Sequence, residues 1–468
     1  MTLADNKTTI CALCTPPGLG SVSVVRISGV NALTISEKIF SKKLKKPRYF
    51  YYGQFLNGKT MIDEGLCVFF NKPHSFTGED VIEYHLHGGK QVSTEILKIL
   101  ENKGAVIASP GEFSYRAYMN GKIDLLKAEA ISDIINSDSQ ASLSNSIMNY
   151  SGNFNKKFND IRDLSIELLA EIESRVDFPE EDIPLIENKK ICNLFDEIAL
   201  KLKSIIQSYD KGVVLKNGLR ILILGPPNAG KSTIFNSFLE NDKAIVSNEP
   251  GTTRDTLEYS ILYNGLKLIF LDTAGIRSTT NKIEKIGIDK ALKEVEFADL
   301  VLLINDISIK DNKIIENNIK SILKKLKKVP RGTIILVNNK IDLIDEKNLR
   351  EKLDFLKSFT LNEKVQSINI SALDSNNSNE VMNKIVSGHS NVAESNPESV
   401  MTNERQKNLS SNALEALYKA KELYIRKVPL EIVSIDIRSL LNILSEITGE
   451  ISNNDIYDVI FAKFCIGK

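Results

Sequence analysis

Residues 219–232 read LRILILGPPNAGKS, and this segment carries the strongest structural signal in the chain. Its first six residues are mostly apolar, which predicts a buried strand, and residues 225–232 match the pattern G-x-x-x-x-G-K-[ST]. Glycines let backbone N–H groups close around phosphate oxygens, and the start of the following helix adds positive potential. We therefore expect a phosphate-binding loop in which Lys231 contacts the outer phosphates and Ser232 binds Mg²⁺.

Three further motifs follow later apolar strands, and they indicate that the bound base is guanine. Asp272-Thr-Ala-Gly275 follows a strand at Lys267–Leu271, which would bring a carboxylate close to the Mg²⁺. Asn339-Lys-Ile-Asp342 follows another strand, and a carboxylate there accepts two hydrogen bonds that guanine offers as a pair and adenine does not. Ser371-Ala-Leu373 follows a fourth strand and is suited to contact the guanine O6 atom. The order and spacing resemble those of translation-factor-like GTPases.

Gly251-Thr-Thr-Arg-Asp255 lies between the phosphate-binding helix and the next strand, so we interpret it as the first switch. Thr253 is then the second Mg²⁺ contact. The residues expected at the GTP site are Asn228, Ala229, Gly230, Lys231, Ser232, Thr233, Ser247, Thr252, Thr253, Asp272, Thr273, Ala274, Gly275, Asn339, Lys340, Asp342, Ser371 and Ala372.

The position that often holds a water-orienting glutamine is Ile276 in this chain. Either hydrolysis is slow without a partner or another side chain orients the water, and Glu284 is the nearby candidate. Its alternative role is an ordinary exposed charge. Arg254 is either an arginine finger or part of a structural salt bridge. A monovalent cation held by Asn228 and the carbonyls of residues 247–252 is a further hypothesis.

The rest of the chain indicates a multidomain protein that combines α+β and α/β domains. Expected strands at Val22–Ile27, Gly65–Phe70 and Val81–His85 give a small N-terminal α+β domain. Long amphipathic helices lie on both sides of the nucleotide-binding segment, which predicts one split helical domain with a P-loop domain inserted into it. That inserted domain should be a parallel sheet with helices on both faces. The expected domains are 1–121, 122–216, 217–385 and 386–468.

Composition sets limits on partners and location. Lys plus Arg and Asp plus Glu are each 60, so net charge gives no overall attraction to nucleic acid or membrane. No apolar run is long enough for a membrane span, and the N-terminus lacks a targeting layout. We therefore expect a cytoplasmic protein with no membrane partner.

The five cysteines are widely spaced and odd in number, which argues against a disulfide framework. Cys11 and Cys14 would point to opposite faces of a strand, so we interpret them as packing residues. Cys465 is either a buried small hydrophobe or a reactive thiol near Lys468.

Motifs along the whole length resemble the MnmE family of tRNA modification GTPases. Besides the GTPase set, the motifs that carry this resemblance are Thr15-Pro-Pro-Gly18, Arg26-Ile-Ser-Gly29, Ser75-Phe-Thr-Gly-Glu-Asp80, His87-Gly-Gly89, Pro110-Gly-Glu-Phe-Ser114, Thr402-Asn-Glu-Arg405 and Phe464-Cys-Ile-Gly-Lys468.

The resemblance implies a function that spacing alone does not give. Members of this family work with a flavin-containing partner protein on the wobble uridine of certain tRNAs. They add an aminomethyl or carboxymethylaminomethyl group at C5, with the one-carbon unit from a tetrahydrofolate derivative (5,10-methylene or 5-formyl). The N-terminal domain binds the folate and forms the homodimer. The GTPase depends on potassium and is stimulated when two G domains meet.

By the same resemblance, functional residues transfer to this sequence. The loop at Asn248-Glu-Pro250 departs from the apolar residues usual in the family, although a carbonyl contact to potassium would not depend on residue identity. The transferred residues are Arg26, Glu83, Lys122 and Lys468 for folate, Asn228, Ser247, Glu249 and Thr252 for potassium, and Glu284 and Cys465 for catalysis.

Two rival functions remain at this point. One is a stand-alone regulatory GTPase whose flanking domains only bind RNA. The other is a dimerising mechanical GTPase with no modification chemistry. The first rival does not explain the Cys-Ile-Gly-Lys end or an N-terminal domain that resembles a folate-binding domain, and folate binding would discriminate against both rivals.

Overall fold

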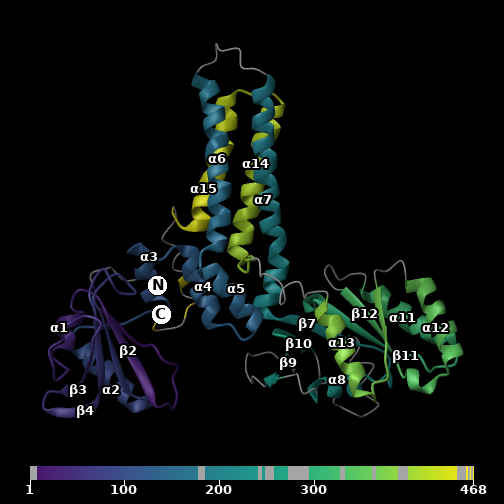
Figure 1. The fold of residues 1–468 in the computed structure, drawn as a ribbon, viewed down its shortest axis with the longest axis horizontal. Coiled ribbons are helices and arrows are strands. Elements are labelled where there is room, and N and C mark those ends of the chain that lie inside the picture. Colours follow the sequence, from purple (N-terminus) through teal and green to yellow (C-terminus); the bar gives the residue numbers. More distant parts are fainter. Residues whose placement is uncertain are drawn as a thin grey trace. The chain divides into compact units, whose positions relative to one another are not determined.

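The computed structural model describes residues 8–177, 185–240, 245–247, 258–271, 295–326, 333–360, 365–387 and 399–450, together with residues 460, 461, 464 and 467. The chain forms two compact units. The first contains residues up to 136, residues 146–206 and residues from 404 onward, and the second contains residues 137–145 and 207–403. Figure 1 shows both units along the chain.

The first unit begins with a mixed six-stranded sheet of order β3-β4-β5-β2-β1-β6. Alternation along β2 sends Val25 and Ile27 into a core with helix α2, while Arg26 lies on the opposite face. All neighbouring strands are antiparallel except β1 and β6, which run parallel. The elements are β1 (Ile10–Leu13), β2 (Val22–Ser28), α1 (Ala32–Ser36), β3 (Phe50–Asn57), β4 (Thr60–Phe70), β5 (Val81–His87), α2 (Lys90–Asn102), β6 (Val106–Ile107) and α3 (Glu112–Met119).

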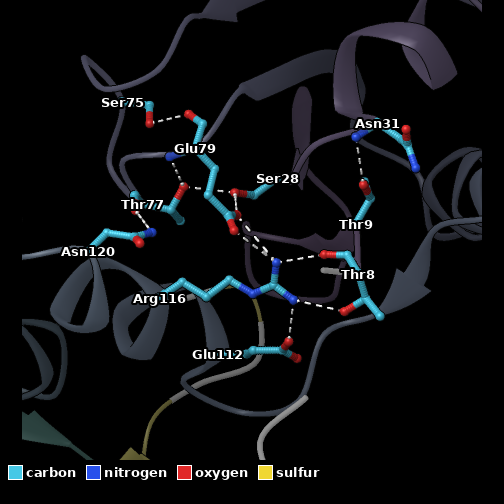
Figure 2. A network of polar contacts seen from close by, with 10 residues as sticks. All are labelled: Thr8, Thr9, Ser28, Asn31, Ser75, Thr77, Glu79, Glu112, Arg116 and Asn120. Atoms are coloured by element: carbon cyan, nitrogen blue, oxygen red, sulfur yellow. Dashed lines mark hydrogen bonds and ion pairs between the residues drawn. The ribbon is translucent and has the colours of Figure 1, made fainter. Parts of the chain in front are cut away.

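A buried arginine ties three segments of this domain together (Figure 2). Arg116 on α3 is 1% exposed and forms ion pairs with Glu112 at 2.9 Å and with Glu79 at 3.2 Å. It also donates to the Thr8 carbonyl oxygen at 2.7 Å, and Glu79 accepts a second hydrogen bond from the Ser28 hydroxyl at 2.6 Å. A buried guanidinium is costly unless its charge is paired with carboxylates. The loop that carries Glu79 is therefore fixed against α3 and β2.

Long helices complete the first unit, and α6, α14 and α15 lie side by side (Figure 1). Arg405, at the start of α14, makes a bidentate contact with the half-buried helix α4 through Glu129 at 3.0 and 3.2 Å. The same guanidinium donates to the carbonyl oxygens of Glu446 and Ile447 near the end of α15. This cation joins three helices that are distant in sequence. Their bounds are α4 (Leu125–Ile135), α6 (Asn153–Asp177), α7 (Leu185–Asn217), α14 (Glu404–Ile425) and α15 (Leu430–Thr448), with α7 divided between the two units.

Residues near the C-terminus pack on the N-terminal domain. The Phe461 ring lies 5.5 Å from that of Tyr115, and a Cβ on Gly111 would meet the Phe461 carbonyl oxygen at 2.3 Å. Gly467 lies against the end of β1, where its carbonyl oxygen accepts from the Cys14 thiol at 3.2 Å. The chain end is thereby attached to the strand next to the one that carries Arg26.

The second unit contains a seven-stranded sheet of order β13-β12-β11-β7-β10-β9-β8. The five strands from β13 to β10 are parallel, whereas β9 and β8 are antiparallel to their neighbours. Helices α8 and α13 pack on one face, and α11 and α12 pack on the other. The bounds are β7 (Leu219–Leu224), α8 (Lys231–Leu239), β8 (Ile245–Ser247), β9 (Tyr259–Tyr263), β10 (Leu266–Leu271), β11 (Leu300–Asp306), α11 (Asn312–Leu326), β12 (Thr333–Asn339), α12 (Glu346–Thr360), β13 (Val365–Asn369) and α13 (Ser375–Ser387).

The start of helix α5 (Gln140–Tyr150) belongs to the second unit. Asp138 forms an ion pair with Lys267 on β10, and the Ala141 N–H donates to the Gly265 carbonyl oxygen in the β9–β10 turn at 3.1 Å. Residues 137–145 therefore pack with a nucleotide-binding fold that begins far later in the sequence.

The elements expected from sequence are present, with longer bounds. The long helices expected on both sides of the nucleotide-binding segment include α7 and α14, and the strand expected at Gly65–Phe70 is the end of β4. The P-loop sheet is parallel with helices on both faces, as expected, but it also carries the antiparallel strands β8 and β9 at one edge. Antiparallel edge strands on parallel sheets are common, and no sequence periodicity distinguished these short strands from a loop.

Replacing Arg116 with alanine should destabilise the chain by about 3–5 kcal/mol, because it leaves two carboxylates without their cation. Urea unfolding of the full chain measures this change. The matched control is Arg438→Ala, which removes an exposed pair with Glu173 and should cost less than about 1 kcal/mol. Equal effects of the two substitutions would contradict the structural role of Arg116.

Candidate nucleotide site

The phosphate-binding loop lies between β7 and α8. Asn228 and Gly230 adopt left-handed backbone conformations, with φ of 60° and 99°. The Lys231 ammonium donates to the carbonyl oxygens of Gly225 at 3.0 Å and Pro226 at 2.8 Å. Ser232 is exposed in the first turn of α8, next to N–H groups that have no partner within the helix. The loop thus gathers the groups that bind phosphate and a hard cation.

Asn339 joins this loop to the base-binding side of the site. Its side-chain Nδ2 donates to the Ala229 carbonyl oxygen at 2.8 Å, and its Oδ1 accepts from the Ala372 N–H at 2.9 Å. A Cβ on Gly230 would lie only 2.1 Å from Asn339 Nδ2. Glycine is therefore required at position 230 by close approach as well as by its positive φ.

Lys340 is positioned by an acid that the sequence analysis did not select. Its backbone is left-handed, with φ of 68°, and its ammonium lies 2.6 Å from an Asp306 carboxylate oxygen. Burial opposes the charge on Asp306, but hydrogen bonds from Lys340 and Ser308 outweigh it and lower the pKa of the Asp306 carboxyl. Asp306 is the last residue of β11. Its position at the end of a buried strand was the feature of the sequence that could have identified it as a site residue.

A cavity of about 550 Å³ brings together Asp342 and Ser371, the two residues expected to contact guanine. Leu373, also at this cavity, is 83% exposed. An exposed leucine beside a carboxylate suits the flat apolar face of a purine, with Asp342 at its polar edge. Sequence reasoning named Leu373 only as part of a motif and gave it no role.

Three asparagines align across the strand ends that carry these loops. Asn305 donates to the Asn338 side-chain oxygen at 3.2 Å, and Asn338 donates to that of Asn369 at 2.8 Å. The register places them directly opposite one another on β11, β12 and β13. This amide row is buried at Asn305 and Asn338 and links the strand ends behind the site.

Several expected site residues cannot be placed. Ser247 ends β8, but its side chain is not described. Lying outside the described residues are Glu249, Thr252, Thr253, Asp272, Thr273, Ala274, Gly275, Glu284, Cys465 and Lys468.

The N-terminal domain brings together the other expected binding residues. Arg26 and Glu83 form an ion pair at 2.7 Å across β2 and β5, with side chains 19% and 18% exposed. The Arg26 guanidinium lies 5.4 Å from the Phe76 ring centre and 5.6 Å from that of Phe113. Lys122 lines a pocket that also contains Phe76.

The cysteines show no sign of metal or redox pairing in the described part of the chain. Cys11 faces the core, where burial and the nearby Glu101 charge raise the pKa of its thiol to about 12, and burial also raises the pKa of Cys67. Cys14 is half-buried and follows the last residue of β1, so it does not lie in the strand in which it was expected. No group of three metal-ligating side chains, and no helix apolar enough to cross a membrane, occurs among the described residues.

Replacing Asp342 with asparagine should reduce the preference for guanine, because the amide cannot accept both hydrogen bonds from its edge. We expect GTP affinity to fall at least about 10-fold while xanthosine triphosphate affinity rises, measured by competition binding. The control is Asp354→Asn on the exposed face of α12. Unchanged selectivity in the Asp342 variant would show that the base contact is misassigned.

Comparisons with known proteins agree with this architecture. The family model for the GTP-binding protein TrmE N-terminus matches residues 9–122, and that for the MnmE helical domain matches residues 125–465. The tRNA modification GTPase MnmE of Acetivibrio thermocellus is 39% identical over 98% of this chain and 99% of its own. The protein of the same name from Bacteroides thetaiotaomicron is 35% identical over 99% of this chain and all of its own.

Among solved structures, a GTP-binding protein from Sulfolobus solfataricus in complex with GDP matches half of this chain and 67% of its own, with 20% identity and a TM-score of 0.29. That score is too low to add to the family match. On the two family models and on relatives of matching length, the chain belongs to the MnmE family of tRNA modification GTPases.

Proposed function

We propose that this chain hydrolyses GTP to drive the modification of tRNA at C5 of the wobble uridine. Together with a flavin-containing partner protein, it would add an aminomethyl or carboxymethylaminomethyl group there, with a one-carbon unit from a tetrahydrofolate derivative. The observation that carries the GTPase assignment is the Asn339 link between the phosphate loop and the cavity of Asp342 and Ser371. The tRNA assignment rests on relatives named tRNA modification GTPase MnmE over their full length.

The nucleotide site supports a Mg²⁺-dependent reaction. Ser232 and Thr253 would hold Mg²⁺, which neutralises charge between the outer phosphates when bound. Lys231 spans the phosphate loop, where it can stabilise the same charge. Glu284 is assigned to orient the attacking water, because Ile276 cannot.

Potassium is proposed as a second cation at this site. The exposed Asn228 side chain offers an oxygen at the loop, and Ser247, Glu249 and Thr252 complete the proposed donor set. Oxygen donors suit a hard monovalent cation. Potassium here would take the place of an arginine finger, and it would support G-domain pairing between two copies.

The folate proposal is supported by the partly exposed Arg26–Glu83 pair on the face of the N-terminal sheet opposite helix α2. A carboxylate can accept hydrogen bonds from a pterin ring as it does from guanine, and the neighbouring, partly exposed Phe76 ring gives an apolar wall. Gly467, which precedes Lys468, packs on the neighbouring strand β1, in keeping with a folate contact from Lys468. A chemical role of Cys465 in the modification belongs to the same proposal.

A homodimer through the N-terminal domain is also proposed. Tyr52 and Leu66 lie opposite each other on β3 and β4 and are 56% and 38% exposed, and Val22 on β2 is 53% exposed. β3 is an edge strand of the sheet. Exposed apolar side chains on an edge strand favour association with another chain.

Mass spectrometry of tRNA nucleosides from cells that lack this protein tests the proposed substrate. The C5-substituted wobble uridines should disappear and return when the wild-type chain is restored. Lys231→Ala, which removes the phosphate contact, should fail to restore them. Normal wobble uridines in the deletion strain would contradict the proposal and favour a regulatory or mechanical GTPase.

Glu284→Ala should lower GTP turnover by about 100-fold while GTP affinity stays within a few-fold of the wild type, because water orientation acts on the reaction and not on binding. Steady-state hydrolysis and equilibrium nucleotide binding measure the two effects separately. An equal loss of both would indicate a structural role.

Wild-type turnover should fall at least about 10-fold when potassium is replaced by sodium at equal ionic strength. Equal rates in the two buffers would rule out the cation site. The Glu284→Ala variant serves as the low-activity baseline in both buffers.

A further inference from the structure

The connection between α1 and β3 carries a concentrated positive charge. Residues 38–62 contain seven lysines and arginines and no aspartate or glutamate, although the whole chain is electrically balanced. Four of these cations fall within Lys42-Lys-Leu-Lys-Lys46, the lysine segment. All four side chains are exposed, and none forms an ion pair with a carboxylate among the residues that the structure describes. A block of like charges that repel one another is often a surface that binds a polyanion.

The lysine segment is held in place by the N-terminal sheet. Just before it, the Ser41 N–H donates to the Gln54 carbonyl oxygen at 2.9 Å, on the side of β3 that does not pair with β4. Within the segment, Leu44 is 3% exposed and packs in the core of the domain. At its end, the Lys46 N–H donates to the Tyr51 hydroxyl at 2.7 Å. The lysines are therefore presented by an ordered backbone along the edge of the sheet, and a bound anion would not have to order it.

An aromatic ring lies beside these lysines. The Lys46 ammonium lies 5.6 Å from the centre of the Tyr49 ring, and that ring packs edge-on against Tyr51 at 4.9 Å. Tyr49 nevertheless remains 50% exposed. Rings next to cations are typical of surfaces that bind unpaired stretches of nucleic acid, because bases stack on the ring while the cations contact phosphates.

The chemistry of the lysine segment favours RNA over a lipid surface. A membrane-binding segment combines lysines with apolar side chains that enter the lipid, commonly on an amphipathic helix. Here the apolar residue of the segment, Leu44, faces the protein core, and the segment is an irregular loop. Lysine is a point charge and lacks the planar fork with which arginine recognises a base edge. The segment therefore suits phosphates and does not read a base sequence.

We propose that the lysine segment binds the phosphate backbone of the tRNA on which this chain acts. This inference rests on the proposed tRNA function, and it adds the surface that holds the RNA and the kind of contact made there. The segment holds tRNA against the N-terminal domain by charge, and it does not select among tRNAs by their sequence.

The test is a titration of the full chain with an unmodified tRNA transcript, followed by fluorescence anisotropy over a series of salt concentrations. The test variant combines Lys42→Gln, Lys43→Gln and Lys45→Gln. It should bind at least about 10-fold more weakly at low salt, because phosphate contacts are lost. The slope of log affinity against log salt should become shallower by about 2–3, close to one for each lysine removed. A transcript with a different anticodon loop should lose the same affinity.

The matched control combines Lys90→Gln, Lys98→Gln and Lys103→Gln. These lysines are exposed on α2 or directly after it, in the same domain, and have no carboxylate partner among the described residues. The control should bind tRNA as the wild type does. Replacing the three lysines of the test variant with arginine keeps their charge and should keep the affinity within a few-fold. Thermal unfolding and GTP hydrolysis of the test variant should equal those of the wild type.

Equal losses in the test variant and the control, or an unchanged affinity in the test variant, would show that the surface is misplaced while the proposed function stands. If the wild type binds no tRNA, this inference fails, and nucleoside analysis of the deletion strain decides the proposed function separately. Lost binding to phosphatidylglycerol vesicles with tRNA binding intact would identify a lipid surface. A changed oligomeric state in sedimentation would identify a contact between copies. Both of these outcomes would overturn the assignment.

Discussion

The nucleotide-binding unit depends on one buried side-chain amide. Asn339 uses both ends of its amide, one on the phosphate loop at Ala229 and one on the base-side loop at Ala372. Both loops follow strands of one sheet, and this side chain ties one loop to the other. Since a buried amide that loses a partner pays the full desolvation cost, the two loops cannot separate independently. Phosphate recognition and base recognition are thus coupled before any ligand is bound.

Sequence reasoning located the strand ends that carry a GTPase motif and missed Asp306, which ends β11 but belongs to no motif. The four GTPase motifs lie at the ends of β7, β10, β12 and β13 because parallel strands deliver their following loops to one edge. The distance along the chain from each strand to its motif is a local property, so it can be seen directly in the sequence. Asp306 acts on Lys340 from the neighbouring strand, and only the register of β11 and β12 reveals that contact.

The same distinction applies in the N-terminal domain. Arg26 and Glu83 came from motif resemblance, and they face each other in the sheet. Lys122 came from the same resemblance, but its place in a pocket with Phe76 depends on how two separate segments fold. Strand β3 was also missed, because Gly53 interrupts its aromatic run. Glycine is unfavourable inside a strand, but a Cβ at position 53 would lie only 2.7 Å from the Phe40 ring. Packing against Phe40 therefore explains why glycine occurs there.

The divided first unit has a consequence for protein synthesis. Glu129 leaves the ribosome long before its partner Arg405, so the unit that starts first is finished last. The inserted unit brings the two ends of the insertion together. Met401 donates its N–H to the Ser208 hydroxyl, although 193 positions separate the two residues. Once that unit has folded, the long insertion behaves as a short closed loop, and little chain entropy remains to oppose the return of α14 and α15. Nascent-chain folding should therefore proceed from the middle outward.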